Sequence, residues 1–199
     1  HLRERFRETA NLELIEADAL DVDLNKHLAG GCSKVVANLP YSVASRLLVD
    51  LAEAPKRPRQ MVVTVQNEVA DRLTAKADTD DYGLLSVILQ LRYDISVRKE
   101  VSPSCFYPPP EVKSAIVNMI LREPAVQPVN YNQFKELLKL CFSKRRKQLG
   151  GILRKRFPQV ETTLPSLGLD LRSRPETLNP EQWVRLSNAL CCTVGGRDA

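Results

Sequence analysis

Glycine is scarce in this chain and poorly placed for gripping a nucleotide. The 199 residues include eight glycines, and the adjacent ones are Gly30-Gly31, Gly150-Gly151 and Gly195-Gly196. None of them follows a predicted strand near the start of the chain, where nucleotide-binding α/β folds carry a glycine-rich turn. The sequence therefore lacks the turn on which such a cofactor site is usually built.

Metal ligands and paired cysteines are also few. Only two histidines are present, and the five cysteines contain no C-x-x-C pair. An odd, scattered count is typical of reduced thiols, and it argues against a disulfide framework or a zinc site. We therefore expect no bound metal. The cysteines are Cys32, Cys105, Cys141, Cys191 and Cys192.

Long apolar runs are missing as well. No segment is apolar over the length needed to span a membrane, and the N-terminus shows no signal-peptide pattern. We expect a cytoplasmic location and no membrane partner. The chain is 43% hydrophobic, which suffices for the core of one medium domain, with or without a small appendage.

Positive charge is concentrated in the last third of the chain. Residues 1–127 carry 16 basic and 18 acidic side chains, whereas residues 128–199 carry 13 basic and 6 acidic ones. A basic segment attached to a near-neutral body predicts a polyanionic partner for that segment.

Short apolar runs alternate with amphipathic helical patterns, which indicates an α/β fold. Because the two kinds of segment alternate, we predict a mostly parallel sheet. The last two strands can close its edge as a hairpin around a proline-rich loop. Strands are expected at 12–15, 34–38, 61–66, 93–97 and 114–121, and helices at 43–54, 67–76 and 83–91.

The pattern becomes entirely helical after a proline-containing linker at 122–130. We therefore predict a sheet domain over residues 1–124 and a small helical domain over residues 128–199. Asn179 is expected to cap the last helix, with Pro180 at its first position. The predicted helices of this part are 131–142, 147–157, 161–167 and 180–190.

Three features that can carry chemistry follow predicted strands or precede one. Asp18 follows the first strand, Asn38-Leu39-Pro40-Tyr41 follows the second, and Phe106-Tyr107 lies on a loop with four prolines between residues 103 and 110. Ligands of open α/β sheets bind beyond the carboxyl ends of strands. If these ends share one edge, a carboxylate, an amide and aromatic rings meet there, a set suited to a planar hydrogen-bonding base.

Each of these features also has a plainer interpretation. Asp18 can be a turn residue and Asn38 likewise, while Tyr41 and Phe106 can belong to the core. The order and spacing of all three features are more specific than any one of them.

Several longer motifs make the chain resemble a known family. N-L-P-Y at Asn38–Tyr41 is similar to the signature of class I methyltransferases that act on amino nitrogens and use S-adenosylmethionine. The further motifs are V-Q-N-E-V-A-D-R-L at 65–73, Y-G-L-L-S-V at 82–87, F-Y-P-P-P-E-V-K-S-A at 106–115 and F-S-K-R-R-K-Q-L at 142–149. Together these motifs resemble those of the ribosomal RNA adenine N6,N6-dimethyltransferases of the bacterial small subunit, from about Leu12 to Leu190.

The resemblance implies a role for each matching residue. Asp18, Ala19 and Asn38 are the implied cofactor-binding residues, and Asp18 would receive the adenine amino group of S-adenosylmethionine. Asn38 and the carbonyl of Leu39 would accept hydrogen bonds from the target amino group. Tyr41 and Phe106 would stack on the two faces of the target base.

A run of cations is the best candidate for phosphate contact. It contains Lys144, Arg145, Arg146 and Lys147, and Arg154 and Lys155 follow about two turns later. The alternative is a solvated helix surface. The regional charge and the resemblance favour ribosomal RNA in the small ribosomal subunit as the partner.

The resemblance also implies an N-terminal part that this sequence does not show. Family members begin with a strand, a glycine-rich turn and a second strand ending in an acid. We therefore expect a Rossmann-like sheet that is N-terminally incomplete, and a 199-residue chain that binds S-adenosylmethionine poorly. The full-length protein is expected to be a monomeric enzyme of ribosome biogenesis.

Two other functions fit the same sequence. A related methyltransferase could act on large-subunit ribosomal RNA, although Y-G-L-L-S-V and the length of the helical tail favour the small-subunit type. A non-catalytic ribosome-assembly factor could keep the fold and the RNA surface. The presence of Asn38, Tyr41 and Phe106 argues against that loss of catalysis.

Overall fold

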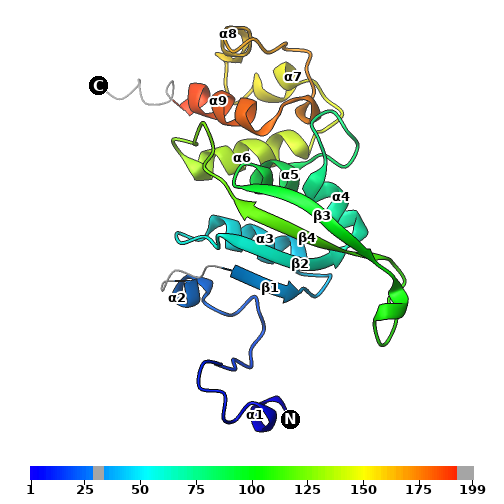
Figure 1. Ribbon diagram of the computed structural model, residues 1–199. Coiled ribbons are helices and arrows are strands. Elements are labelled where there is room, and N and C mark those ends of the chain that lie inside the picture. Colours follow the sequence, from blue (N-terminus) through cyan, green and yellow to red (C-terminus); the bar gives the residue numbers. More distant parts are fainter. Residues whose placement is uncertain (29–33, 192–199) are drawn as a thin grey trace.

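A four-stranded mixed sheet forms the centre of the protein (Figure 1). The computed structural model describes residues 1–28 and 34–191. The strands lie in the order β1-β2-β4-β3, with β1 parallel to β2 and β4 antiparallel to both of its neighbours. They are β1 (Lys34–Asn38), β2 (Gln60–Gln66), β3 (Tyr93–Val101) and β4 (Ser114–Leu121).

The prediction of a mostly parallel sheet is wrong for these strands, and the predicted hairpin is confirmed. β3 and β4 are joined by a loop and a short 3-10 turn, η1 (Pro103–Cys105), with no crossover helix. A direct connection of this kind produces an antiparallel pair. β4 then inserts between β2 and β3, so the hairpin contributes two strands of the sheet.

Three helices lie beside the sheet: α3 (Ala44–Glu53), α4 (Asn67–Thr74) and α5 (Leu84–Gln90). Alternate residues of β2, namely Met61, Val63 and Val65, are buried, while the residues between them are only half-buried. This period of two is the pattern of a strand with one well-covered face. Burial of the apolar faces of the helices against that strand face forms the core.

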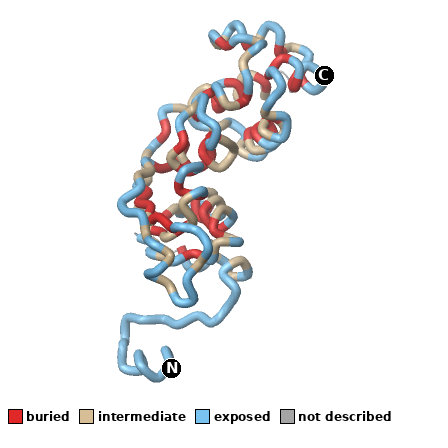
Figure 2. Tube along the Cα trace, turned by 90° about the vertical axis from the view of Figure 1, so that its right-hand side faces the viewer, coloured by how far each residue is buried: buried red, intermediate tan, exposed pale blue. Residues whose placement is uncertain are grey.

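The segment before β1 does not follow the prediction. No strand forms at 12–15, and Leu12, Leu14 and Ile15 are 44%, 38% and 50% exposed. A strand needs a partner for its backbone hydrogen bonds, and no described strand lies beside this segment. Residues 1–28 form two short helices, α1 (Leu2–Arg5) and α2 (Leu24–Leu28), and the chain before α2 extends away from the body (Figures 1 and 2).

After β4, the helices of the described chain, which ends at residue 191, follow the predicted all-helical pattern: α6 (Tyr131–Phe142), α7 (Leu149–Leu153), α8 (Val160–Ser166), the 3-10 turn η2 (Pro175–Thr177) and α9 (Pro180–Cys191). The helix predicted at 147–157 is shorter than expected. Adjacent Gly150 and Gly151 disfavour the helix, and turns follow it. The predicted cap of α9 is confirmed, because Asn179 Oδ1 accepts a hydrogen bond from the Gln182 amide at 2.9 Å.

The helical part packs on α5 and α3. The Tyr82 hydroxyl donates to the Leu178 carbonyl at 2.8 Å, and the Phe142 ring lies between Tyr82 and Trp183. Glu53 on α3 accepts hydrogen bonds from Tyr131 and Lys135 on α6, at 3.1 and 2.7 Å. These contacts link the two parts through apolar and polar groups.

Candidate functional site

A pocket of about 320 Å³ lies where the end of β1 meets the loop between β3 and β4. All four residues that the sequence nominates for catalysis line it, although β1 and the loop are far apart in the chain. The lining residues are Asn38, Leu39, Pro40, Tyr41, Phe106, Tyr107, Pro108 and Pro110.

Asn38 is the last residue of β1, and its side chain is exposed. Its side-chain amide makes no hydrogen bond with any other residue that the structure describes, so the side-chain oxygen is available to a ligand. Leu39 is buried and its backbone amide donates to the Thr64 carbonyl at 3.3 Å, which ties the turn to β2. Pro40 then accepts from the Val43 amide at 3.2 Å and leads the chain into α3.

The ring of Tyr41 is held by a hydrogen bond to the β3–β4 hairpin. Its hydroxyl lies 2.7 Å from the hydroxyl of Ser114, the first residue of β4. Ser114 is fully buried and Tyr41 is half-buried. The bond fixes the ring relative to the hairpin, so the β1 turn and the proline loop act as one site.

Phe106 lies on a stiff backbone. Its amide donates to the Pro103 carbonyl at 3.1 Å, and prolines occupy positions 108 to 110. Proline fixes the backbone φ angle, so the loop holds its aromatic rings at defined positions. Phe106 is half-buried, whereas its neighbour Tyr107 is 100% exposed.

Asp18 and Ala19 lie apart from this pocket. Both are exposed, and the Asp18 carboxylate accepts a hydrogen bond from the Leu20 amide at 2.9 Å, as a turn aspartate does. Ala19 lines a different hollow together with the carboxylates of Asp23, Asp50 and Glu53. The described residues therefore bring Asn38, Tyr41 and Phe106 into one pocket and leave Asp18 and Ala19 outside it.

The basic cluster consists of residues 144–147, Arg154 and Lys155. Some of its side chains bind protein groups and the others do not. Arg145 donates to the carbonyl of Thr79 at 2.8 Å and to that of Asp80, and its Nε lies 3.6 Å from Oε2 of Glu176. It joins the turn after α6 to the loop before α5. Arg154 is paired with Glu161 at 2.8 Å.

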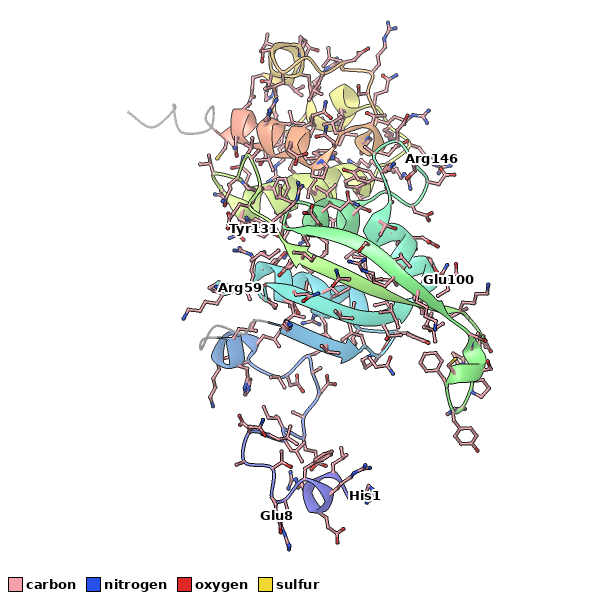
Figure 3. All side chains as sticks on the ribbon, in the orientation of Figure 1. His1, Glu8, Arg59, Glu100, Tyr131 and Arg146 are labelled. Carbon is pink, nitrogen blue, oxygen red and sulfur yellow. The ribbon has the colours of Figure 1, made fainter. Side chains whose placement is uncertain are left out.

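The other predicted phosphate contacts are exposed. Their side chains form no hydrogen bond or ion pair within residues 1–28 and 34–191. They are Lys144, Arg146, Lys147 and Lys155. Figure 3 shows Arg146 on the outside of the helical part. These four cations remain available to a polyanion.

Sequence reasoning missed Ser114 as a part of the site and gave Tyr107 no role of its own. Ser114 begins an ordinary apolar strand, and nothing in the sequence indicates that its hydroxyl meets Tyr41. Tyr107 stands beside Phe106 in the same motif, and only its exposure at the pocket rim distinguishes the two rings.

The described residues contain neither a metal-binding cluster nor a membrane-spanning helix. No group of three or more histidine, cysteine or acidic side chains is arranged to hold a metal ion there. No described helix has the length and apolar character required to cross a membrane. Cys32, Cys192 and the glycine pairs at 30–31 and 195–196 lie outside the described residues.

Comparison with known sequences identifies the family of the chain. A family model described as ribosomal RNA adenine dimethylase matches residues 1–191. A ribosomal RNA small subunit methyltransferase A from Geobacter metallireducens is 35% identical over 98% of this chain and 74% of its own length. The protein of the same description from Nitrosospira multiformis is 39% identical over 94% of this chain and 71% of its own length.

Comparison with solved structures gives the same fold. A dimethyladenosine transferase from Plasmodium falciparum superposes with a TM-score of 0.75 at 22% identity, covering 93% of this chain and 75% of that one. The 23S rRNA methyltransferase ErmE superposes with a TM-score of 0.66 at 27% identity, covering 96% and 76%. Together with the family match across nearly the whole length, this places the chain in the ribosomal RNA adenine dimethylase family.

Proposed function

We propose that the pocket between β1 and the β3–β4 hairpin receives an adenine of small-subunit ribosomal RNA for methylation at N6, twice in succession. One observation carries the proposal: Asn38, Leu39, Tyr41 and Phe106 line a single pocket. The family and the small-subunit relatives support the choice of reaction and substrate. The protein is thus an rRNA adenine N6-dimethyltransferase.

The reaction needs positioning more than a strong base. The lone pair of the adenine amino nitrogen is delocalised into the ring, so this nitrogen is a poor nucleophile. The Asn38 amide oxygen and the Leu39 carbonyl accept hydrogen bonds from its N–H groups and turn the lone pair toward the methyl donor. Neutral acceptors suffice, because the methylated nitrogen sheds a proton readily. Such preorganised acceptors lower the barrier by orientation and electrostatics.

The two rings hold the base. An adenine in folded RNA must leave its stack to enter the pocket, at a cost of a few kcal/mol. Stacking on Tyr41 and Phe106 offsets that cost, since one base–aromatic stack contributes roughly 1–3 kcal/mol. The Tyr41–Ser114 hydrogen bond keeps one ring in place before the base arrives, which reduces the entropy lost on binding.

S-adenosylmethionine is the methyl donor that family membership implies, and it supplies an electrophilic methyl group when bound. Asp18 and Ala19 are the residues that the motif nominates for its adenine end, with Asn38 at the boundary with the substrate. Asp18 and Ala19 lie apart from Asn38 in the described structure, so the exposed segment that carries them must move toward the pocket before the three can bind S-adenosylmethionine together.

RNA binding is assigned to the free cations of the helical part: Lys144, Arg146, Lys147 and Lys155. Arg145 and Arg154, which the sequence also nominates, are bound to protein groups in this structure. We propose that residues 1–124 and 128–199 are the catalytic and RNA-binding domains. The protein acts in ribosome biogenesis, in the cytoplasm, as a monomer on the small ribosomal subunit.

A methyl-transfer assay tests the reaction. The whole protein is incubated with labelled S-adenosylmethionine and small ribosomal subunits that lack the modification, beside the Asn38→Ala variant. Label should enter the RNA as N6,N6-dimethyladenosine, and Asn38→Ala should lower the rate by a hundredfold or so, the effect of losing an oriented acceptor.

The same assay separates the two other candidate functions. Transfer by the wild type to large subunits alone would identify a large-subunit enzyme, the activity named for one structural neighbour. Binding without transfer would identify a non-catalytic assembly factor. Equal labelling by Asn38→Ala and the wild type would refute the role given to Asn38.

A further inference from the structure

The tip of the β3–β4 hairpin carries an aromatic ring with nothing packed against it. Tyr107 is 100% exposed, yet it lines the same pocket as Asn38 and Phe106. Figure 1 shows the hairpin extending beyond the rest of the sheet. A bare ring at the rim of a pocket that takes a base offers an apolar face to whatever lies beside that base.

The ring is held by a stiff backbone. The 3-10 turn η1 precedes it and Pro108 follows it directly, while the pairing of Val101 with Ser114 closes the loop. Because proline limits the conformations of this segment, little entropy is lost when Tyr107 engages a partner. Rigid aromatic side chains of this kind are effective contact residues.

Strand register places a cation on the same side of the sheet as Asn38. Asn38 pairs with Thr64, Thr64 with Ile116, and Ile116 with Lys99. Paired residues of neighbouring strands share a face, so Lys99 lies in the row of Asn38, three strand spacings or roughly 14 Å away.

The backbone beside Lys99 is irregular. The register shifts between Val97 and Lys99, so Arg98 occupies a bulge in β3. Bulges redirect side chains and are frequent beside active sites. The side chains of Arg98 and Lys99 are both exposed, and they form no hydrogen bond or ion pair with the described part of the chain.

We propose that the hairpin grips the nucleotide beside the target adenine, with Tyr107 stacked on its base and Lys99 against the phosphate backbone. The inference rests on the proposed function and deepens it. A base that leaves its stack deprives its neighbour of a stacking partner. Tyr107 at the pocket rim takes that place, while Tyr41 and Phe106 hold the target itself.

Fluorescence of 2-aminopurine tests the stacking. Two single-stranded RNA hexamers are used, one with 2-aminopurine in place of its single adenine and one with 2-aminopurine next to that adenine. The whole protein should quench both probes. Tyr107→Ala should lose the quenching of the neighbour probe alone, and Tyr107→Phe should keep both.

Each other outcome has a definite meaning. If Tyr107→Ala still quenches the neighbour probe, or loses the quenching of both probes, the inference is wrong. If the wild type quenches neither probe and methylates no subunit, the proposed function fails and the inference falls with it.

Kinetics on unmethylated small ribosomal subunits give a second readout. Tyr107→Ala should raise KM about tenfold, the effect of losing one stacked base, with kcat nearly unchanged. Its melting temperature should stay at the wild-type value because the ring is exposed. A fall in kcat at unchanged KM would place Tyr107 in the chemistry and overturn the proposal.

Salt dependence tests the phosphate contact. Lys99→Gln should make the plot of log affinity against log salt shallower by about one unit. The matched control is Arg59→Gln, an exposed cation at the opposite end of the sheet from Glu100, the neighbour of Lys99 (Figure 3). An equal change in the two variants would contradict a specific role for Lys99.

Discussion

The hydroxyls of Tyr41 and Ser114 lie 2.7 Å apart and join the turn after β1 to the first residue of β4. Ser114 has no exposed surface, so this bond is protected from water on one side. The ring of Tyr41 is thereby oriented by a strand that begins 73 residues later. The substrate pocket depends on this link between two distant segments.

Removing either of these two hydroxyls should affect activity more than folding. Ser114→Ala should lower kcat/KM about fivefold, the value of one ordinary hydrogen bond of about 1 kcal/mol. Tyr41→Phe should have a similar effect, and the double variant should be no worse than either single one, because both remove the same bond. Additive losses measured in the double-mutant cycle would show that the two hydroxyls act separately.

Arg145 and Arg146 should behave differently although they are adjacent. Arg145→Ala removes the contacts to Thr79, Asp80 and Glu176, so it should lower the free energy of unfolding by roughly 1–2 kcal/mol in urea titrations. Arg146→Ala should leave stability unchanged and reduce the salt dependence of RNA binding by about one phosphate contact. The reverse pattern would contradict the division of the basic cluster.

Stability should fall in strong alkali because a buried tyrosine ionises more readily in the unfolded chain than in the folded protein. Burial raises the pKa of Tyr93 to about 12, and the nearby Arg57 and Arg92 oppose that shift. The folded pKa lies above the unfolded value of about 10, so this contribution is complete below pH 10 and is lost as the pH rises toward 12.

Tyr93→Phe isolates this contribution. The variant loses the hydrogen bond to the Pro58 carbonyl at 3.1 Å and should be less stable at neutral pH. Its free energy of unfolding should then fall less steeply than that of the wild type between about pH 10 and 11.5. Parallel curves in urea titrations would show that Tyr93 does not titrate in this way.

The cysteines should differ in reactivity. Burial raises the pKa of Cys141 to about 12, an effect that Lys144 partly opposes, whereas Cys105 is exposed. The thiolate is the reactive form, so iodoacetamide at pH 8 should modify Cys141 at least about a hundredfold more slowly than Cys105. Peptide mass mapping over time measures both rates, and equal rates in the folded protein would contradict the burial of α6.

The 199-residue chain should bind S-adenosylmethionine weakly. Asp18 and Ala19 lie outside the pocket that contains Asn38, so the residues nominated for the cofactor do not act together. Calorimetric titration should therefore detect no binding in the micromolar range. Micromolar affinity, abolished by Asp18→Ala, would mean that the exposed segment folds onto the pocket when the cofactor binds.

Much of the site could be predicted from local sequence. Asn38-Leu39-Pro40-Tyr41 ends an apolar run with polar and aromatic groups on a proline-fixed turn, and the four prolines around Phe106 exclude a helix or central strand. These properties belong to short segments, so they do not depend on the rest of the fold. The amphipathic helices were predictable for the same reason.

The predictions from sequence are wrong where the structure of a segment depends on contacts with distant residues. Leu12–Ile15 has the composition of a strand, but a strand exists only beside another strand, and none of the described strands lies there. Arg145 looks like its basic neighbours in sequence, yet the carbonyls of a loop some 65 residues away engage it. No local pattern contains that information.

The sequence by itself determined the chemical groups of the pocket, the stiffness of their turns and the position of the basic helical part. Tertiary structure alone decided that β4 enters the sheet between β2 and β3, which brings Ser114 to Tyr41 and Phe106 to Asn38. The physical reason is that residue type and backbone stiffness are local properties. Strand order, register and side-chain partners arise only when distant segments are packed together.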